Sequence, residues 1–103
     1  MTLLAVYTTV ASREEALTMA KALVERRLAA CAQVSEIESV YRWDGAVRHE
    51  PEFRIVFKTV AARYAEVEAA IRELHSYELP AIYALAVEQA DPRYAAWVKE
   101  ELP

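Results

Sequence analysis

Glycine is nearly absent from this chain, since Gly45 is the only one among 103 residues. Phosphate-binding loops and dinucleotide-binding turns need several glycines, because their backbone must approach the phosphate groups closely. The sequence therefore excludes both motifs. Cysteine is equally scarce, since Cys31 is the only one. One cysteine and the two histidines of the chain are too few for a four-ligand zinc site built from Cys and His. A lone cysteine forms no internal disulfide, and we therefore expect a cytoplasmic protein.

An excess of basic residues and a long apolar run are also missing. The formal net charge is -4 and the isoelectric point is near 5.2, whereas proteins that bind nucleic acids are usually basic. No stretch approaches the roughly 18 apolar residues of a membrane span. The apolar residues 1–10 lack a basic leader and a small-residue cleavage site, so we interpret them as a strand and not as a signal peptide. We expect neither a nucleic-acid partner nor a membrane.

What is present fits a single domain over residues 1–103. Hydrophobic residues make up 55% of the chain and charged residues 27%, which is ordinary for a globular protein. A chain of this length suffices for one hydrophobic core with little to spare.

The dipeptide Asp44-Gly45 lies at the midpoint of a β-rich stretch from about Ala32 to Thr59. Asp-Gly favours a type I′ turn, in which both central residues have positive φ, and therefore predicts a β-hairpin. Each arm holds about a dozen residues and, at roughly 3.3 Å per residue, reaches some 40 Å. A domain of this size is only about 35 Å across. We therefore expect the hairpin to outreach its own subunit and to be completed by other copies of the chain.

Two features predict irregularities in this hairpin. The polar cluster Ser35, Glu36 and Glu38 is typical of a β-bulge. Pro51 cannot donate a ladder hydrogen bond, which places the start of the second arm at a sheet edge or a bulge.

Helices are predicted on both sides of the hairpin. Ser12 and Glu15 form a capping box before a helix that ends near 27–29, and a second helical repeat covers about 61–75. Asp91 and Pro92 are typical of the start of a closing helix. The core stripe of the first helix consists of Ala16, Met19, Ala20, Leu23 and Val24. With strands at 3–10 and 81–87, the order is that of an α/β (α+β), ferredoxin-like βαββαβ sandwich with a long hairpin and a C-terminal helix.

Cys31 and His75 are the candidate metal ligands. Cys31 follows an apolar helix-to-strand junction, where burial as a small hydrophobe competes with a role as a thiolate ligand or redox thiol. His75 lies at the predicted end of a helix, where the helix dipole favours a cation. The alternative is a metal or ligand contact made together with Glu78 and groups of another subunit. His49, close to the hairpin tip, is interpreted as solvated surface.

A looser set of aromatic and charged residues forms a candidate ligand-binding cleft. It consists of Tyr41, Trp43, Glu52, Lys58, Tyr77 and Trp97. Aromatic residues on a hairpin usually pack against a partner, which for a projecting hairpin is another subunit. Lys58 stands among apolar strand residues and either pairs with Glu52 or binds an anionic ligand. No nucleophile, base and acid stand together, so we expect no enzymatic activity and no required cofactor.

Several segments together resemble the CutA divalent-cation tolerance proteins. They are the segments Ala22 to Cys31, Ser39 to Gly45, Lys58-Thr59, Leu74 to Tyr77 with Pro80, and Tyr94 to Trp97. The match is collinear over nearly the whole chain, and the elements Leu-Ala-Ala-Cys and Tyr-x-Trp-x-Gly are specific in combination. The resemblance implies a ferredoxin-like subunit related in architecture to PII signalling proteins. It also implies a tight homotrimer in which extended hairpins pair across subunits.

The role associated with that family is tolerance of divalent metals, and copper binding is attributed to some members. The chain departs from the family at Thr8, where some members have cysteine, and at Leu74, where some have a second histidine. Ser76 replaces the proline of His-Pro-Tyr, and Ala81 replaces a glutamate. Because copper prefers imidazole and thiolate ligands, the resemblance implies weak copper or other divalent-cation binding at Cys31 and His75. The alternatives are a PII-like sensor or scaffold for a small anionic ligand, and a purely structural trimer.

Overall fold

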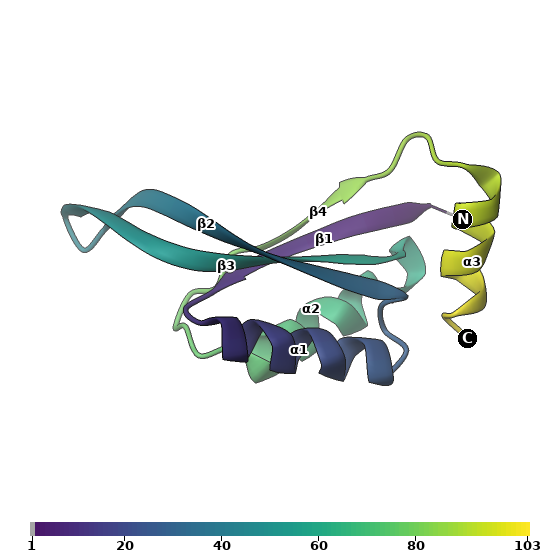
Figure 1. The fold of residues 1–103 in the computed structure, drawn as a ribbon, viewed down its shortest axis with the longest axis horizontal. Helices are drawn as coiled ribbons and strands as arrows, with labels where there is room; N and C mark the ends of the chain where they lie inside the picture. The colour runs from purple at the N-terminus through teal and green to yellow at the C-terminus, as the bar shows by residue number, and fades with distance from the viewer. Residues whose placement is uncertain (1) are drawn as a thin grey trace.

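The computed structural model describes residues 2–103, and the predicted order βαββαβ followed by a helix is confirmed (Figure 1). The elements are β1 (Leu3–Val10), α1 (Arg13–Glu25), β2 (Cys31–Trp43), β3 (Ala46–Val60), a 3₁₀ turn (Ala61–Arg63), α2 (Tyr64–Leu74), β4 (Ile82–Ala86) and α3 (Pro92–Glu100). The last strand is one residue shorter at each end than predicted. No helix within the described residues is long and apolar enough to cross a membrane.

The four strands form one antiparallel sheet in the order β2-β3-β1-β4. Asp44 (φ 53°) and Gly45 (φ 78°) both have positive φ, as the predicted type I′ turn requires. From the turn, pairing runs without interruption from Trp43 opposite Ala46 to Cys31 opposite Lys58. The predicted bulge is therefore wrong: polar residues on this ribbon reflect its exposure to solvent and not a break in pairing.

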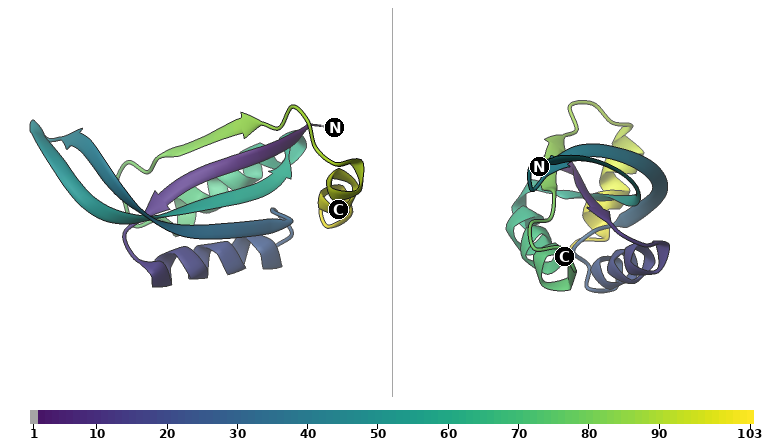
Figure 2. Two further views of the ribbon diagram at one scale, coloured as in Figure 1. Left: turned by 45° about the horizontal axis from the view of Figure 1, so that its top comes forward. Right: turned by 90° about the vertical axis from the view of Figure 1, so that its left-hand side faces the viewer.

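The hairpin projects beyond the rest of the subunit, as predicted (Figures 1 and 2). The chain measures 45 × 25 × 21 Å, and every residue from 41 to 51 is exposed. Pairing between β1 and β3 ends at Phe53, so Pro51 lies where β3 has only β2 beside it. The predicted edge position of Pro51 is confirmed.

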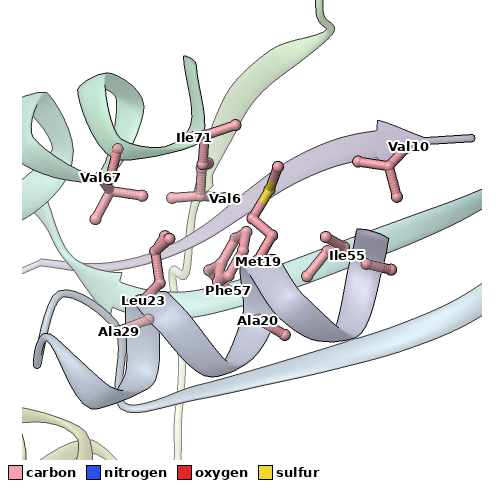
Figure 3. Packing of buried hydrophobic residues seen from close by; sticks show 12 residues of the cluster. Val6, Val10, Met19, Ala20, Leu23, Ala29, Ile55, Phe57, Val67 and Ile71 are labelled. Carbon is pink, nitrogen blue, oxygen red and sulfur yellow. The ribbon is translucent and has the colours of Figure 1, made fainter. Parts of the chain in front are cut away.

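Both α1 and α2 cover the same face of the sheet, and the main core lies between them and the strands (Figures 2 and 3). Its fully buried large side chains come from β1, α1, β3 and α2. They are Val6, Val10, Met19, Leu23, Ile55, Phe57, Val67 and Ile71. Full burial of such a side chain contributes about 1.5–3 kcal/mol. Val24, predicted in the core stripe, is 37% exposed and instead borders a hollow of ≈ 560 Å³ between α1 and β2.

The ends of α1 depart in part from the sequence prediction. The Glu15 N–H donates to the Ser12 hydroxyl at 3.1 Å, which confirms the predicted N-cap. The helix ends at Glu25, earlier than expected, because Arg27 adopts φ 58°. The Leu28 N–H then bonds the Leu23 carbonyl at 3.0 Å, which is the Schellman arrangement. Glycine usually occupies the left-handed position of this motif, and here an arginine does.

The second face of the sheet has less cover. At one end α3 packs through Val98 against Leu3, Ala30 and Val60, which form a smaller second cluster. Elsewhere on β4, Tyr83 and Leu85 remain half-exposed, although Tyr83 stacks on Tyr7 at 5.2 Å between ring centroids. The sheet thus keeps apolar surface along β4.

Candidate functional site

A buried carboxylate marks the base of the hairpin. Glu52 lies on β3 next to Phe53, the outermost β3 residue that pairs with β1, and is only 8% exposed. Tyr77, in the loop between α2 and β4, donates its hydroxyl to Glu52 Oε2 at 2.7 Å. Burial, and then this hydrogen bond, raise the pKa of Tyr77 far above its ordinary value. The phenol of Tyr77 is therefore held in its neutral form.

His75 holds the backbone that carries Tyr77. Its Nε2 lies 2.8 Å from the carbonyl oxygen of Thr9 at the end of β1, and the Tyr77 N–H donates to its Nδ1 at 3.1 Å. A carbonyl can only accept and a backbone N–H can only donate, so the proton of this imidazole lies on Nε2. Both ring nitrogens are therefore engaged within the subunit.

The loop around His75 is also fixed to α1. The backbone N–H and the hydroxyl of Ser76 donate to Glu15 Oε2 at 3.2 and 2.9 Å. The predicted capping box would have the Glu15 carboxylate accept from the Ser12 N–H. In the structure this carboxylate instead accepts from Ser76, in the loop between α2 and β4. Ser76 thereby secures the segment in which Tyr77 lies.

A second phenol–carboxylate pair lies beside the first. Tyr41 donates its hydroxyl to Glu50 Oε2 at 3.0 Å, and this bond raises the pKa of Tyr41. Glu52 raises it further, and Tyr41 and Glu15 add to the increase at Tyr77. The hairpin thus carries carboxylates and neutral phenols from its base outward, together with Arg48, which lowers the pKa of Tyr41.

The other end of the sheet holds a different cluster. Cys31 lies opposite Lys58, and its Sγ is 3.8 Å from the hydroxyl of Tyr94. Tyr94 packs on Trp97 with ring centroids 5.9 Å apart. Cys31 is half-buried here. This exposure fits neither a fully buried small hydrophobe nor a freely accessible thiol, the two alternatives that the sequence left open.

The predicted pair of Lys58 and Glu52 is wrong. The Lys58 Nζ donates to Gln33 Oε1 at 3.0 Å, whereas Glu52 accepts from Tyr77. The two charged residues stand six positions apart on β3, roughly 20 Å along the strand. No side chain spans that distance.

The six residues of the predicted cleft occupy three places in one subunit. Glu52 and Tyr77 meet at the base of the hairpin, Tyr41 and Trp43 lie further out along β2 toward the turn, and Lys58 and Trp97 lie at the opposite end. His49, interpreted as surface, is exposed and pairs with Glu38 at 2.9 Å. A common cleft for all six therefore requires more than one chain.

The two candidate metal ligands are likewise apart. Cys31 pairs with Lys58, which in turn pairs with Ala5 on β1. His75 contacts Thr9, which lies four residues, or about 13 Å, beyond Ala5 along β1. Within residues 2–103, no three His, Cys, Asp or Glu side chains are grouped so that they could hold a metal ion.

Sequence reasoning missed several contacts of these clusters, namely those of Glu15, Gln33, Glu50 and Tyr94. A signal for Gln33 was present, because a two-residue turn at 44–45 fixes the register and places Gln33 diagonally across from Lys58. No such signal exists for Ser76 and Glu15, whose contact depends on how a loop folds over a helix.

Comparison with known proteins gives a consistent result over the whole chain. The family model for the CutA1 divalent ion tolerance protein matches residues 4–101. The divalent-cation tolerance protein CutA of Thermotoga maritima is 38% identical over 97 residues, 94% of this chain and 96% of that protein. The protein of the same description from Thermus thermophilus is 40% identical over 93 residues, covering 89% and 90%.

Solved structures agree with the fold. CutA from Synechococcus elongatus superimposes with a TM-score of 0.96 at 33% identity, covering 99% of this chain and 91% of that one. The Archaeoglobus fulgidus structure, described as a periplasmic divalent cation tolerance protein CutA, gives a TM-score of 0.93 at 35% identity, with 98% of both chains covered.

Proposed function

Because this chain belongs to the CutA1 divalent ion tolerance family, we propose that it acts in the tolerance of divalent cations as a non-enzymatic homotrimer. The family match over residues 4–101 carries the first part of this proposal. We place the protein in the cytoplasm on the strength of its single cysteine, although one similar structure is described as periplasmic.

The projecting hairpin supports the assembly. Val40, Trp43 and Val47 on its distal half are 69%, 43% and 65% exposed, and β2 and β4 are the two edges of the sheet. Edge strands with exposed apolar residues are prone to pair with another chain. Copies of the same chain would cover these residues and bring the three separate parts of the predicted cleft together.

Sedimentation in the analytical ultracentrifuge tests the assembly directly. We expect a mass three times the 11.7 kDa of one chain, maintained on dilution to micromolar concentration. A folded monomer over the same range would contradict the proposal.

Metal binding is the second part of the proposal. We expect copper or another divalent cation to bind weakly, because His75 must give up the Thr9 carbonyl or the Tyr77 N–H to become a ligand. Calorimetric titration with Cu(II) should show reduced heat in His75→Ala and Cys31→Ser, and unchanged heat in His49→Ala. Equal heats in wild type and His75→Ala would remove His75 from the metal site.

A second candidate function is a PII-like sensor or scaffold for a small anionic ligand. It is favoured by Lys58, whose ammonium group is bonded to the neutral amide of Gln33 and not to a carboxylate. Thermal-shift screening with nucleotides and small organic acids tests it. A stabilisation lost in Lys58→Gln would support a sensor, and no shift at millimolar ligand would contradict it.

A further inference from the structure

We propose that Glu52 is the anchor of a binding site for an organic cation, a guanidinium or protonated amine, supplied by a free ligand or by a side chain of another copy of this chain. The inference deepens the proposed ligand-binding cleft and rests on that proposed function for its place in the assembly. It begins with a carboxylate that is nine-tenths buried and has no cationic partner.

The immediate partner of Glu52 is neutral. Tyr77 donates its hydroxyl to Oε2, and within residues 2–103 no Lys, Arg or His nitrogen lies within 4.0 Å of the carboxylate. Tyr41 and Glu15 raise the pKa of the Tyr77 phenol further, and the cation Arg48 acts on Tyr41, whose pKa it lowers. A carboxylate that is largely removed from water and has no cation beside it is unfavourable, so a cation bound at Glu52 would be stabilised. Oε1 is not a buried unpaired atom, so it remains open to such a partner.

The surroundings of Glu52 favour an organic cation over a metal ion. A divalent metal ion takes several anionic or imidazole ligands, but both nitrogens of His75 are engaged and the phenol of Tyr77 keeps its proton. The ring of Tyr77, whose hydroxyl bonds Glu52, instead provides an aromatic neighbour, and aromatic rings attract ammonium and guanidinium groups. One carboxylate with an aromatic neighbour is suited to a donor with several N–H groups.

His75 and Ser76 keep this site in shape. His75 ties the Tyr77 backbone to the end of β1, and Ser76 ties the same loop to Glu15 on α1. The Tyr77 hydroxyl therefore occupies Oε2 in a fixed position and leaves Oε1 as the oxygen on which a cation would bind.

The test uses the full chain in its native assembly, with methylguanidinium and n-butylammonium as probes and acetate as an anionic control. Carbon-13 NMR of the side-chain carboxyl groups in the wild type should show a saturable shift at Glu52, with none at Glu50, when a probe is added. Glu50 is the matched control, because it lies two residues away on the same strand, accepts a tyrosine hydroxyl as Glu52 does, and is exposed.

Two variants then distinguish the sources of the cation. If the cation is a free ligand, Glu52→Gln weakens probe binding about tenfold or more and Glu50→Gln leaves it unchanged. If another copy supplies the cation, Glu52→Gln weakens self-association by a similar factor, whereas Glu50→Gln does not. Both results support the site. The inference is overturned if no probe shifts the Glu52 carboxyl in the wild type and Glu52→Gln associates as tightly as Glu50→Gln.

The mass of the wild-type assembly tests the proposed trimer independently of the cation site. A wild-type monomer overturns the proposed trimer, but a Glu52 shift on addition of a probe still supports the cation site. A wild-type trimer in which neither Glu52 result appears retains the proposed assembly and rejects the cation site.

Discussion

Thr8 and Thr59 both have buried side chains on neighbouring strands, yet only Thr59 has a hydrogen-bond partner. The Thr59 hydroxyl donates to the Leu28 carbonyl at 2.7 Å, whereas the Thr8 hydroxyl has no partner. Their exposed fractions are 0% for Thr59 and 1% for Thr8, so bulk solvent reaches neither side chain. A buried polar group without a partner costs about 1–3 kcal/mol.

This difference predicts opposite effects of the same substitution. Thr8→Val removes the unpaired hydroxyl and should raise the free energy of unfolding by about 1 kcal/mol. Thr59→Val leaves the Leu28 carbonyl without its donor and should lower it by about 1–2 kcal/mol. Urea denaturation of both variants measures the effects. A loss of stability in Thr8→Val would show that its hydroxyl has a partner, such as an ordered water.

Arg27→Gly should stabilise the protein. Arg27 holds φ 58° at the end of α1, a conformation that costs a residue with a side chain roughly 1–2 kcal/mol and glycine almost nothing. Part of that gain is lost to the greater freedom of glycine in the unfolded chain, so we expect a net increase of about 0.5–1 kcal/mol. Arg26→Gly is the matched control, because Arg26 is helical at φ -76° and should lose stability. If both variants lost stability, the arginine side chain itself would have to contribute at position 27.

Gly45→Val should weaken self-association more than it unfolds the core. A Cβ at Gly45 meets nothing within 4 Å, so the cost comes from the backbone alone, at φ 78°. This strain disturbs the turn, which lies far from the buried cluster between the sheet and α1 and α2. Sedimentation at low concentration and circular dichroism measure the two effects separately. Asp44→Asn, which tolerates positive φ, should leave both unchanged. Identical mass distributions for Gly45→Val and wild type would show that the turn has no importance in assembly.

Ionisation of Tyr77 should destabilise the folded protein at alkaline pH. Its pKa is raised in the folded protein above the ordinary value of 10.0, by burial first and then by Glu52. Its contribution to stability is therefore complete below about pH 10 and lost as pH rises toward the raised value. In Tyr77→Phe, the free energy of unfolding should decline less steeply above about pH 10, as urea denaturation along a pH series will measure. An equally steep decline in both proteins would assign the effect to other tyrosines.

Much of the fold follows from local signals in the sequence. Asp44-Gly45 fixes a two-residue turn, and the turn fixes the register of every pair down to Cys31 and Lys58. Ser12 and Asp91 begin their helices where capping chemistry predicts. These elements were predictable because each depends on residues a few positions apart.

The site was less predictable, because its contacts join segments far apart in the chain. Tyr77 reaches Glu52 across 25 positions, and Ser76 reaches Glu15 across 61. The wrong pairing of Lys58 with Glu52 came from their complementary charge, although both lie on one strand that holds them apart. Their separation by six positions along that strand excludes the pair.

The uninterrupted pairing of β2 with β3 restricts how the length of the hairpin can change. Side chains alternate between the two faces of the ribbon, so loss of one residue from a single arm would move every later side chain of that arm to the opposite face. Removal of two facing residues keeps the remaining pairs but moves the part of both arms beyond them to the opposite face, whereas removal of two residues from each arm keeps both the pairs and the faces. The hairpin can thus be made shorter or longer only by equal changes in both arms, with Asp44 and Gly45 kept at its tip.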